Sequence, residues 1–248
     1  MSRKSYHDTN KINQGIRMND ENLVVEVKAM VYSNARKLTL SAWLKKHREA
    51  EYKIPLKLQK FLFFYEAFSK VAGDDNADFD HLRGYKNGPV FSNVFGDYTK
   101  ERGAFERKAD ACYELFGKKI NSTIALQCGF MVATLSEQEL SAITHEMNIW
   151  KSQEKFINQG CYQVSLSESD FNEHDYDMIR MLGEMYPVEM IKASEVMRVG
   201  NSYFVLNKAD LTRLTEEHLD VLMSLTDNAE LHNPVFVTID EEGCLLID

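Results

Sequence analysis

The chain has 248 residues, 44% of them hydrophobic, which is enough for one large domain or for a domain with an extension. No window approaches the roughly 18 consecutive apolar residues of a membrane helix, and the first twenty residues lack an apolar signal region, so we expect a cytoplasmic protein. The net charge of −9 is unevenly divided, because residues 1–159 carry +4 and residues 160–248 carry −13. Such an acidic final third repels nucleic acid and attracts a basic protein surface, although a well-hydrated surface is the simpler interpretation.

The N-terminal region is basic. Residues 1–20 are polar and nearly free of apolar side chains, which predicts a disordered arm. Residues 1–60 together hold 13 basic and 6 acidic side chains, a surplus of +7 that could contact phosphate. Apolar residues then recur at roughly helical spacing and predict a first amphipathic helix that includes Leu23, Val27, Met30, Val31 and Leu38.

Residues 54–68 predict a central helix. Pro55 suits its first turn, where the missing amide hydrogen would have no partner. The helix is apolar on two faces, which favours a position between neighbours rather than on a surface. A narrow polar strip holds Gln59 and Glu66, and these side chains, with Lys60, need partners in a packed interior. They could organise a pocket or an interface, or they could bond to a neighbouring loop such as the one that carries Gly88.

The remaining elements alternate with short breaks. Residues 71–82 predict a loop, and Gly88 and Pro89 predict a turn before a helix within residues 90–98. We expect further helices at residues 100–118, after the S-x-x-E capping box at Ser136, at residues 171–186 and at residues 215–225. Strands are predicted at residues 202–206 and in a closing β-hairpin over residues 234–248, and residues 161–169 predict a short strand or a linker. The predicted fold class is mainly α, with an α+β C-terminal extension.

Cysteine and histidine patterns give no support for chemistry at a metal. The four cysteines lie far apart without a C-x-x-C pair and predict small buried hydrophobic side chains: Cys112, Cys128, Cys161 and Cys244. His145 begins an H-E pair but Ile149 stands where a zinc-binding H-E-x-x-H motif needs its second histidine. A hydrogen-bonded histidine that orients the turn carrying Trp150 is the preferred interpretation.

Other catalytic signatures are absent from the sequence. His174, Asp175 and Asp177 could ligate a cation or share a proton, but acidic residues of this kind are common where a helix begins. The sequence contains no G-x-S-x-G elbow, P-loop or G-x-G-x-x-G motif. We therefore expect no catalytic residue, no metal and no cofactor, and the chain is not expected to be an enzyme.

Three segments together resemble the signature of the SocA-like Panacea domain. The first has the form L-Q-K-L-L-Y-F-x-x-A and is matched by Leu58, Gln59, Lys60, Phe61, Leu62, Phe63, Phe64, Tyr65, Glu66 and Ala67. The second centres on G-P-V and is matched by Tyr85, Gly88, Pro89, Val90 and Val94. The third has the form L-S-x-x-T-H-x-x-x-x-W and is matched by Leu140, Ser141, Thr144, His145 and Trp150. Phe63 replaces the usual tyrosine, and Ile149 replaces a proline that often precedes the tryptophan.

The resemblance implies a helical domain at residues 21–165, between the arm at residues 1–20 and an acidic α+β extension at residues 166–248. It implies an antitoxin, which neutralises a cognate protein toxin by direct contact or delivers the toxin to a protease. The motif positions implied as structural or partner-binding are Gln59, Lys60, Tyr65, Tyr85, Gly88, Pro89, Thr144, His145 and Trp150. The acidic extension suits a basic toxin. The alternative is a nucleic-acid-binding regulator that uses the basic N-terminal segment.

Overall fold

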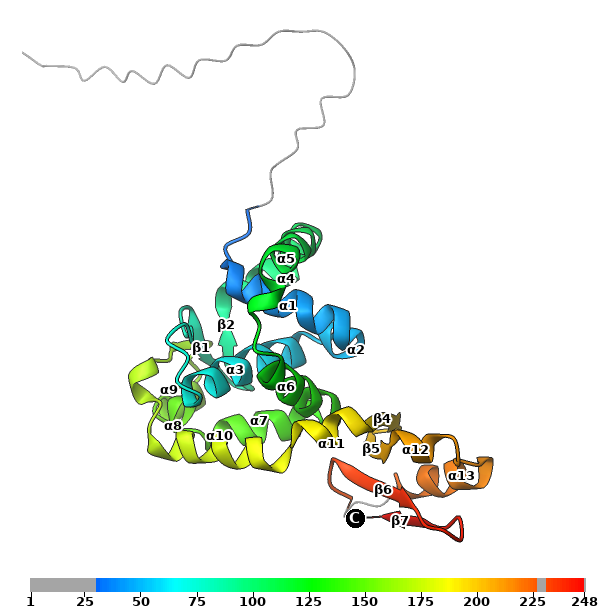
Figure 1. The fold of residues 1–248 in the computed structure, drawn as a ribbon. Helices are drawn as coiled ribbons and strands as arrows, with labels where there is room; N and C mark the ends of the chain where they lie inside the picture. Colours follow the sequence, from blue (N-terminus) through cyan, green and yellow to red (C-terminus); the bar gives the residue numbers. More distant parts are fainter. Residues whose placement is uncertain (1–29, 227–230, 248) are drawn as a thin grey trace, which may run out of the picture.

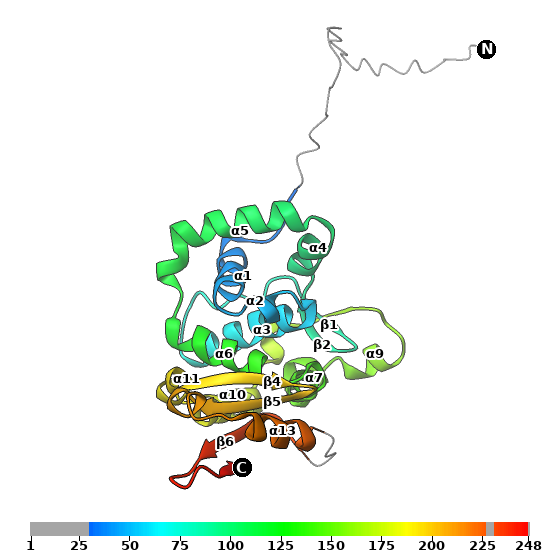
Figure 2. The same cartoon turned by 90° about the vertical axis from the view of Figure 1, so that its right-hand side faces the viewer.

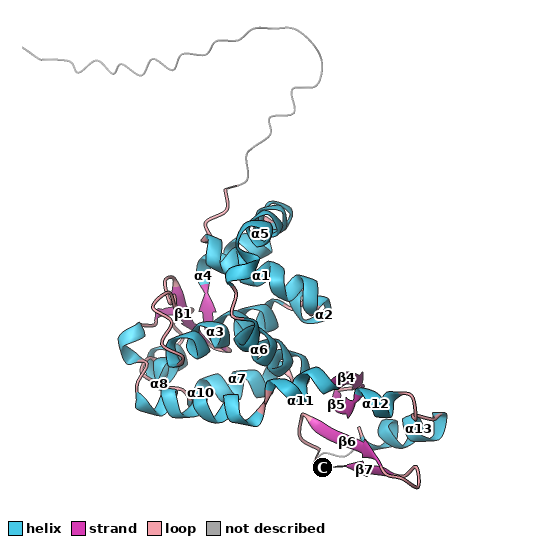
Figure 3. Ribbon diagram, viewed as in Figure 1, coloured by secondary structure: helices cyan, strands magenta, loops and turns pink. Residues whose placement is uncertain are grey.

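The computed structural model describes residues 30–226 and 231–247. This part of the chain is mainly helical with two small sheets, which confirms the predicted fold class (Figure 3). Leu23, Val27 and the predicted arm at residues 1–20 lie outside the described residues. Within the described ranges, no helix combines the length and the apolar character needed to cross a bilayer.

The elements follow one another with short connections. The helices are α1 (Ala35–His47), α2 (Glu49–Tyr52), α3 (Pro55–Val71), α4 (Ser92–Lys100), α5 (Arg102–Phe116), α6 (Ser122–Thr134), α7 (Glu137–Glu146), α8 (Asn148–Lys151), α9 (Glu154–Asn158), α10 (Glu173–Met185), α11 (Val188–Ala193), α12 (Lys208–Leu211) and α13 (Glu216–Leu225). The strands are β1 (Leu82–Tyr85), β2 (Gly88–Phe91), β3 (Val164–Ser165), β4 (Ser194–Val199), β5 (Ser202–Asn207), β6 (Val235–Ile239) and β7 (Leu245–Ile247). Short 3-10 turns lie at Gly117–Lys119 and Glu168–Asp170.

Helix α3 is the central element, as its two apolar faces predict. Figures 1 and 2 show it enclosed by α1 and α2, by α6, and by the layer that contains α7 and α10. Thirteen consecutive residues from Lys57 to Ser69 are buried, including the polar Gln59, Lys60 and Glu66. A helix surrounded in this way can retain polar residues only where each one finds a partner.

A small antiparallel sheet, in the order β2-β1-β3, packs beside α3. Strands β1 and β2 form a hairpin in which Tyr85 pairs with Gly88, so that the connecting turn consists of Lys86 and Asn87. The sequence places a turn at Gly88 and Pro89 instead, and this prediction is wrong by two residues. The sharp backbone change is at Gly88, whose φ of +105° is open to glycine, but the residue already belongs to β2.

The second sheet, in the order β4-β5-β6-β7, forms the core of a C-terminal module that we define as residues 194–226 and 231–247. The predicted closing hairpin is confirmed, because β6 and β7 pair antiparallel with Val237 opposite Ile247. Strand β6 also pairs with β5 in parallel. Helix α13 covers this sheet through Leu222, which lies in a small second cluster with Phe204 and Val235.

The C-terminal module docks on the helical part through polar contacts as well as apolar ones. The Lys57 ammonium on α3 donates to the Tyr203 hydroxyl at 3.2 Å and lies 4.5 Å from the centre of its ring. The Asn233 backbone N–H donates to the Glu139 carboxylate at 3.2 Å. Residues 166–193 belong to the helical part rather than to the module, since Phe171 lies in the main hydrophobic cluster with α3. The predicted boundary at residue 165 stays a prediction, although the main core continues past it.

Several local predictions differ from the structure. The first helix begins at Ala35, because the Asn34 side chain accepts the N–H of Lys37 as an N-cap. Met30 and Val31 precede it and are not helical, so the expected stripe is wrong there. The prediction of buried thiols holds for Cys128 alone as a fully buried side chain. Cys112 is half-buried, and Cys161 and Cys244 are exposed in irregular segments.

Candidate functional site

The three motif segments meet around the Lys86–Asn87 turn, which we call the hairpin turn. Lys60 of α3 extends its side chain to this turn and donates to the Asn87 carbonyl oxygen at 2.7 Å. It also donates to the Thr144 hydroxyl of α7 at 2.5 Å. Thr144 in turn donates to the carbonyl oxygen of Ser141, one turn earlier in its helix. One buried lysine therefore connects the first motif to the second and to the third.

Gly88 is required at this point for space as well as for backbone conformation. A Cβ atom at Gly88 would lie 2.1 Å from the Lys60 nitrogen and 2.6 Å from the Thr144 hydroxyl. Both distances are far inside van der Waals contact, so any side chain at this position would displace the lysine. Pro89 follows in β2, where it is buried opposite Gly84. The G-P pair therefore shapes the strand against which Lys60 rests.

The electrostatic state of Lys60 is unusual. Its side chain is 1% exposed, and no carboxylate of the described residues forms an ion pair with it. Burial without a counter-charge favours the neutral amine and lowers the pKa of Lys60 well below its usual value. The amine is held between the hairpin turn and α7, a position that suits a structural contact, and Lys60 also lines a cavity of about 860 Å³ beside the turn.

The third motif also contacts the hairpin at the last residue of β1, directly before the turn. The Trp150 indole donates its Nε1 hydrogen to the Tyr85 carbonyl oxygen at 3.0 Å. The His145 ring stacks on Trp150 with ring centres 3.9 Å apart. Burial, and then the nearby Lys60, lowers the pKa of His145. The expected orientation of Trp150 thus comes from stacking. The His145 Nε2 is buried with no hydrogen-bond partner among the described residues, while a hydrogen bond to the Lys86 backbone acts to raise the His145 pKa against these two effects.

Gln59 and Tyr65 fasten α3 to two further segments. The Phe91 N–H of β2 donates to the Gln59 Oε1 at 2.8 Å. The Asn121 N–H, at the N-cap of α6, donates to the Tyr65 hydroxyl oxygen at 2.9 Å. The interpretation of Gln59 as an internal tie to the loop region around Gly88 agrees with this geometry. Its partner is an amide in β2.

Glu66 has partners that the sequence analysis missed. Its carboxylate is fully buried and accepts from the Arg36 Nε at 3.0 Å and from the Lys37 Nζ at 2.6 Å. It also accepts the Asp78 N–H at 3.0 Å. Two cations from α1 therefore neutralise a carboxylate in the centre of the fold, about thirty residues away along the chain. No local pattern in the sequence signals this pairing.

The acidic residues near His174 do not form a cation site. Asp175 accepts the backbone N–H groups of Asn148 at 2.5 Å and Ile149 at 3.0 Å, which begin the short helix α8. Asp177 pairs with Arg180 at the surface. Among the residues that the structure describes, no group of three or more His, Cys, Asp or Glu side chains is arranged to hold a metal ion.

No family model, no curated protein and no solved structure matches this chain. The resemblance to the SocA-like Panacea signature therefore stays a prediction based on the motif residues. The structure adds that the three segments are in mutual contact through buried hydrogen bonds.

Proposed function

We propose that this chain is an antitoxin of the SocA-like Panacea type, which neutralises a basic protein toxin by binding it directly. The observation that carries the proposal is the meeting of the three motif segments at the hairpin turn. Lys60, Thr144 and Trp150 are used there in contacts that hold the fold. Residues that fix a scaffold from within leave its outer surfaces to bind a partner.

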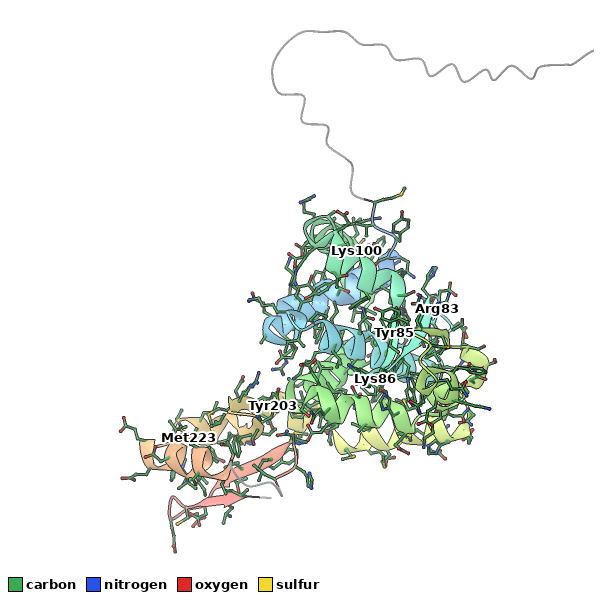
Figure 4. The ribbon with its side chains drawn as sticks, turned by 180° about the vertical axis from the view of Figure 1, so that it is seen from behind. Arg83, Tyr85, Lys86, Lys100, Tyr203 and Met223 are labelled. Atoms are coloured by element: carbon green, nitrogen blue, oxygen red, sulfur yellow. The ribbon has the colours of Figure 1, made fainter. Side chains whose placement is uncertain are left out.

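The C-terminal module supplies the surface that best suits a basic partner. Helix α13 buries only Leu222 and begins with Glu216 and Glu217. Leu219 and Met223, one helical turn apart, are 38% and 60% exposed. An apolar stripe flanked by carboxylates combines a hydrophobic contact with charge complementarity, the combination used by specific protein interfaces. Figure 4 shows Met223 on the outer part of the module.

The proposal expects a small reading frame beside this gene that encodes a toxic and basic protein, and that protein is the partner to test first. We expect growth to be restored when the two are co-expressed and the purified proteins to form a complex. The double variant Leu219→Ala with Met223→Ala should weaken binding at least about tenfold, because both side chains would be desolvated at the contact. The control is Leu115→Ala, which truncates a leucine on α5 that is 73% exposed, more than either residue of the double variant.

Two results would count against the proposal in different ways. A neighbouring protein that is harmless and does not bind would refute the antitoxin function. Full neutralisation by the Leu219→Ala and Met223→Ala variant would keep the function but refute α13 as the contact surface. Both variants should first be shown by circular dichroism to keep the wild-type helical content.

A further inference from the structure

A second surface of the molecule has the opposite character to the C-terminal module. Two adjoining cavities, about 620 and 860 Å³ in volume, share the side chains of Tyr85, Phe95 and Tyr162. Arg83 and Lys100 line the first cavity, and Lys86 lines the second. We call the combined surface the aromatic–basic groove. Figure 4 shows Arg83, Tyr85, Lys86 and Lys100 on the same side of the molecule.

The cations of this groove are free to meet an anion. No carboxylate of the described residues forms an ion pair with Arg83, Lys86 or Lys100. Residues 83–100 contain a single acidic side chain, Asp97. Asp97 is buried and turned inward, where it accepts from the Tyr32 and Ser33 backbone and from the Ser33 hydroxyl.

The rest of the lining adds little negative charge. The first cavity has no aspartate or glutamate in its lining, and the second has only Glu137. A locally positive groove on a chain with net charge −9 is a strong local departure from the overall balance.

The Tyr85 ring of the groove is held in place before any ligand arrives. Tyr85 is fixed at its backbone by Trp150 and at its hydroxyl by Gln163, to which it donates at 2.6 Å. Its ring meets Tyr162 edge-on with ring centres 5.5 Å apart and lies 6.4 Å from Phe95. Tyr162 itself is 77% exposed, so one broad aromatic face is open to solvent.

We propose that the aromatic–basic groove binds a few nucleotides of a single-stranded nucleic acid. In this arrangement a base stacks on the exposed Tyr162 ring, and Arg83, Lys86 and Lys100 contact successive phosphates. Open aromatic faces alternating with unpaired cations are the features by which proteins bind single strands without reading their sequence. An acidic peptide would use the cations but would gain little from the rings, and a duplex would hide its base faces.

This site is separate from the toxin contact proposed for α13 and does not depend on it. It also differs from the predicted nucleic-acid contact of the basic N-terminal segment at residues 1–60, because its cations Arg83, Lys86 and Lys100 lie later in the chain. The motif residues contribute to the groove indirectly. Lys60 and Trp150 hold the β1–β2 hairpin, which carries Tyr85 and Lys86.

The test is fluorescence anisotropy with the full-length protein and a labelled oligothymidylate of about ten nucleotides, titrated across roughly 50 to 200 mM salt. We expect saturable binding that weakens as salt rises. Tyr162→Ala should weaken it about tenfold, whereas Tyr162→Phe keeps the ring and should bind as the wild type does. Arg83→Gln and Lys100→Gln should each reduce the slope of log affinity against log salt by about 0.7. Lys118→Gln, an exposed lysine outside the groove, should leave the slope unchanged.

Three outcomes would overturn the inference. The first is an absence of binding at the lowest salt. The second is binding of wild-type strength by both Tyr162→Ala and Arg83→Gln. If removal of residues 1–20 then abolished binding, the N-terminal segment would be the nucleic-acid contact. The third is displacement of the oligonucleotide by polyglutamate at equal charge concentration, because that would show that the rings play no part.

Discussion

The substitution Gly88→Ala is the sharpest test of the hairpin turn. The new methyl group would lie 2.1 Å from the Lys60 nitrogen and 2.6 Å from the Thr144 hydroxyl. Relief of this overlap requires the lysine to withdraw, which removes one of the two donors to the Asn87 carbonyl oxygen and leaves the Ser141 hydroxyl at 3.1 Å. A backbone at φ +105° is in addition strained for alanine.

These effects set the magnitude. Backbone strain costs about 1–3 kcal/mol and overpacking of a full site about 1–3 kcal/mol. We therefore expect Gly88→Ala to lower the free energy of unfolding by about 2–6 kcal/mol, measured by urea denaturation followed by circular dichroism.

A matched control and a double variant separate the two causes. Gly96 lies within helix α4, and no atom comes within 4 Å of a Cβ built on it. Gly96→Ala should be neutral or stabilising by up to about 1 kcal/mol, because alanine favours helix. Lys60→Ala removes the group that clashes with the new methyl. Its cost should be smaller in the Gly88→Ala background than in the wild type, by about 1 kcal/mol or more. A loss below about 1 kcal/mol for Gly88→Ala, or additive effects in the double variant, would refute the reasoning.

Three further predictions concern single buried contacts. Lys60→Met should remove a pH dependence of stability. The unfolded chain keeps the lysine proton up to a pKa of about 10.5, whereas the folded chain releases it at lower pH, so the free energy of unfolding of the wild type relative to the variant should rise with pH towards 10.5. A difference between the two denaturation curves that does not change with pH would contradict the assignment. Trp150→Phe keeps an aromatic ring but removes the indole donor to the Tyr85 carbonyl oxygen, which should cost about 0.5–1.5 kcal/mol by urea denaturation. Tyr203→Phe removes the hydroxyl partner of the buried Lys57 and should cost about 1–3 kcal/mol, and an unchanged midpoint would show that this contact does not help to dock the C-terminal module.

The sequence is informative where a local rule decides the structure. The two apolar faces of residues 54–68 identify α3, and the capping box at Ser136 is formed as predicted, with Glu139 closing it. The closing hairpin follows from alternation on both sides of a glycine turn. In each case the determining interactions lie within a few residues of one another.

The sequence is uninformative where partners are distant or where burial removes the pattern. Helix α6 was not predicted, because it is apolar on all sides and shows no period. Its Gly129 allows the Trp43 ring to approach, and a Cβ there would lie 3.1 Å from that ring. Strand β4 was missed as well, since charged and apolar residues alternate in it only briefly. The aromatic–basic groove brings Tyr162 to Arg83 across about eighty residues, which only the fold reveals.

The central ties share a property that bears on how this molecule could diversify. Five side chains of the buried network reach main-chain atoms: Gln59 to the Phe91 N–H, Lys60 to the Asn87 carbonyl, Tyr65 to the Asn121 N–H, Glu66 to the Asp78 N–H and Trp150 to the Tyr85 carbonyl. A main-chain carbonyl is present whatever residue occupies the position, and a main-chain N–H is present for every residue except proline. The segments held by these ties can therefore exchange their outward side chains without losing their place. One interior can thus support many different exteriors.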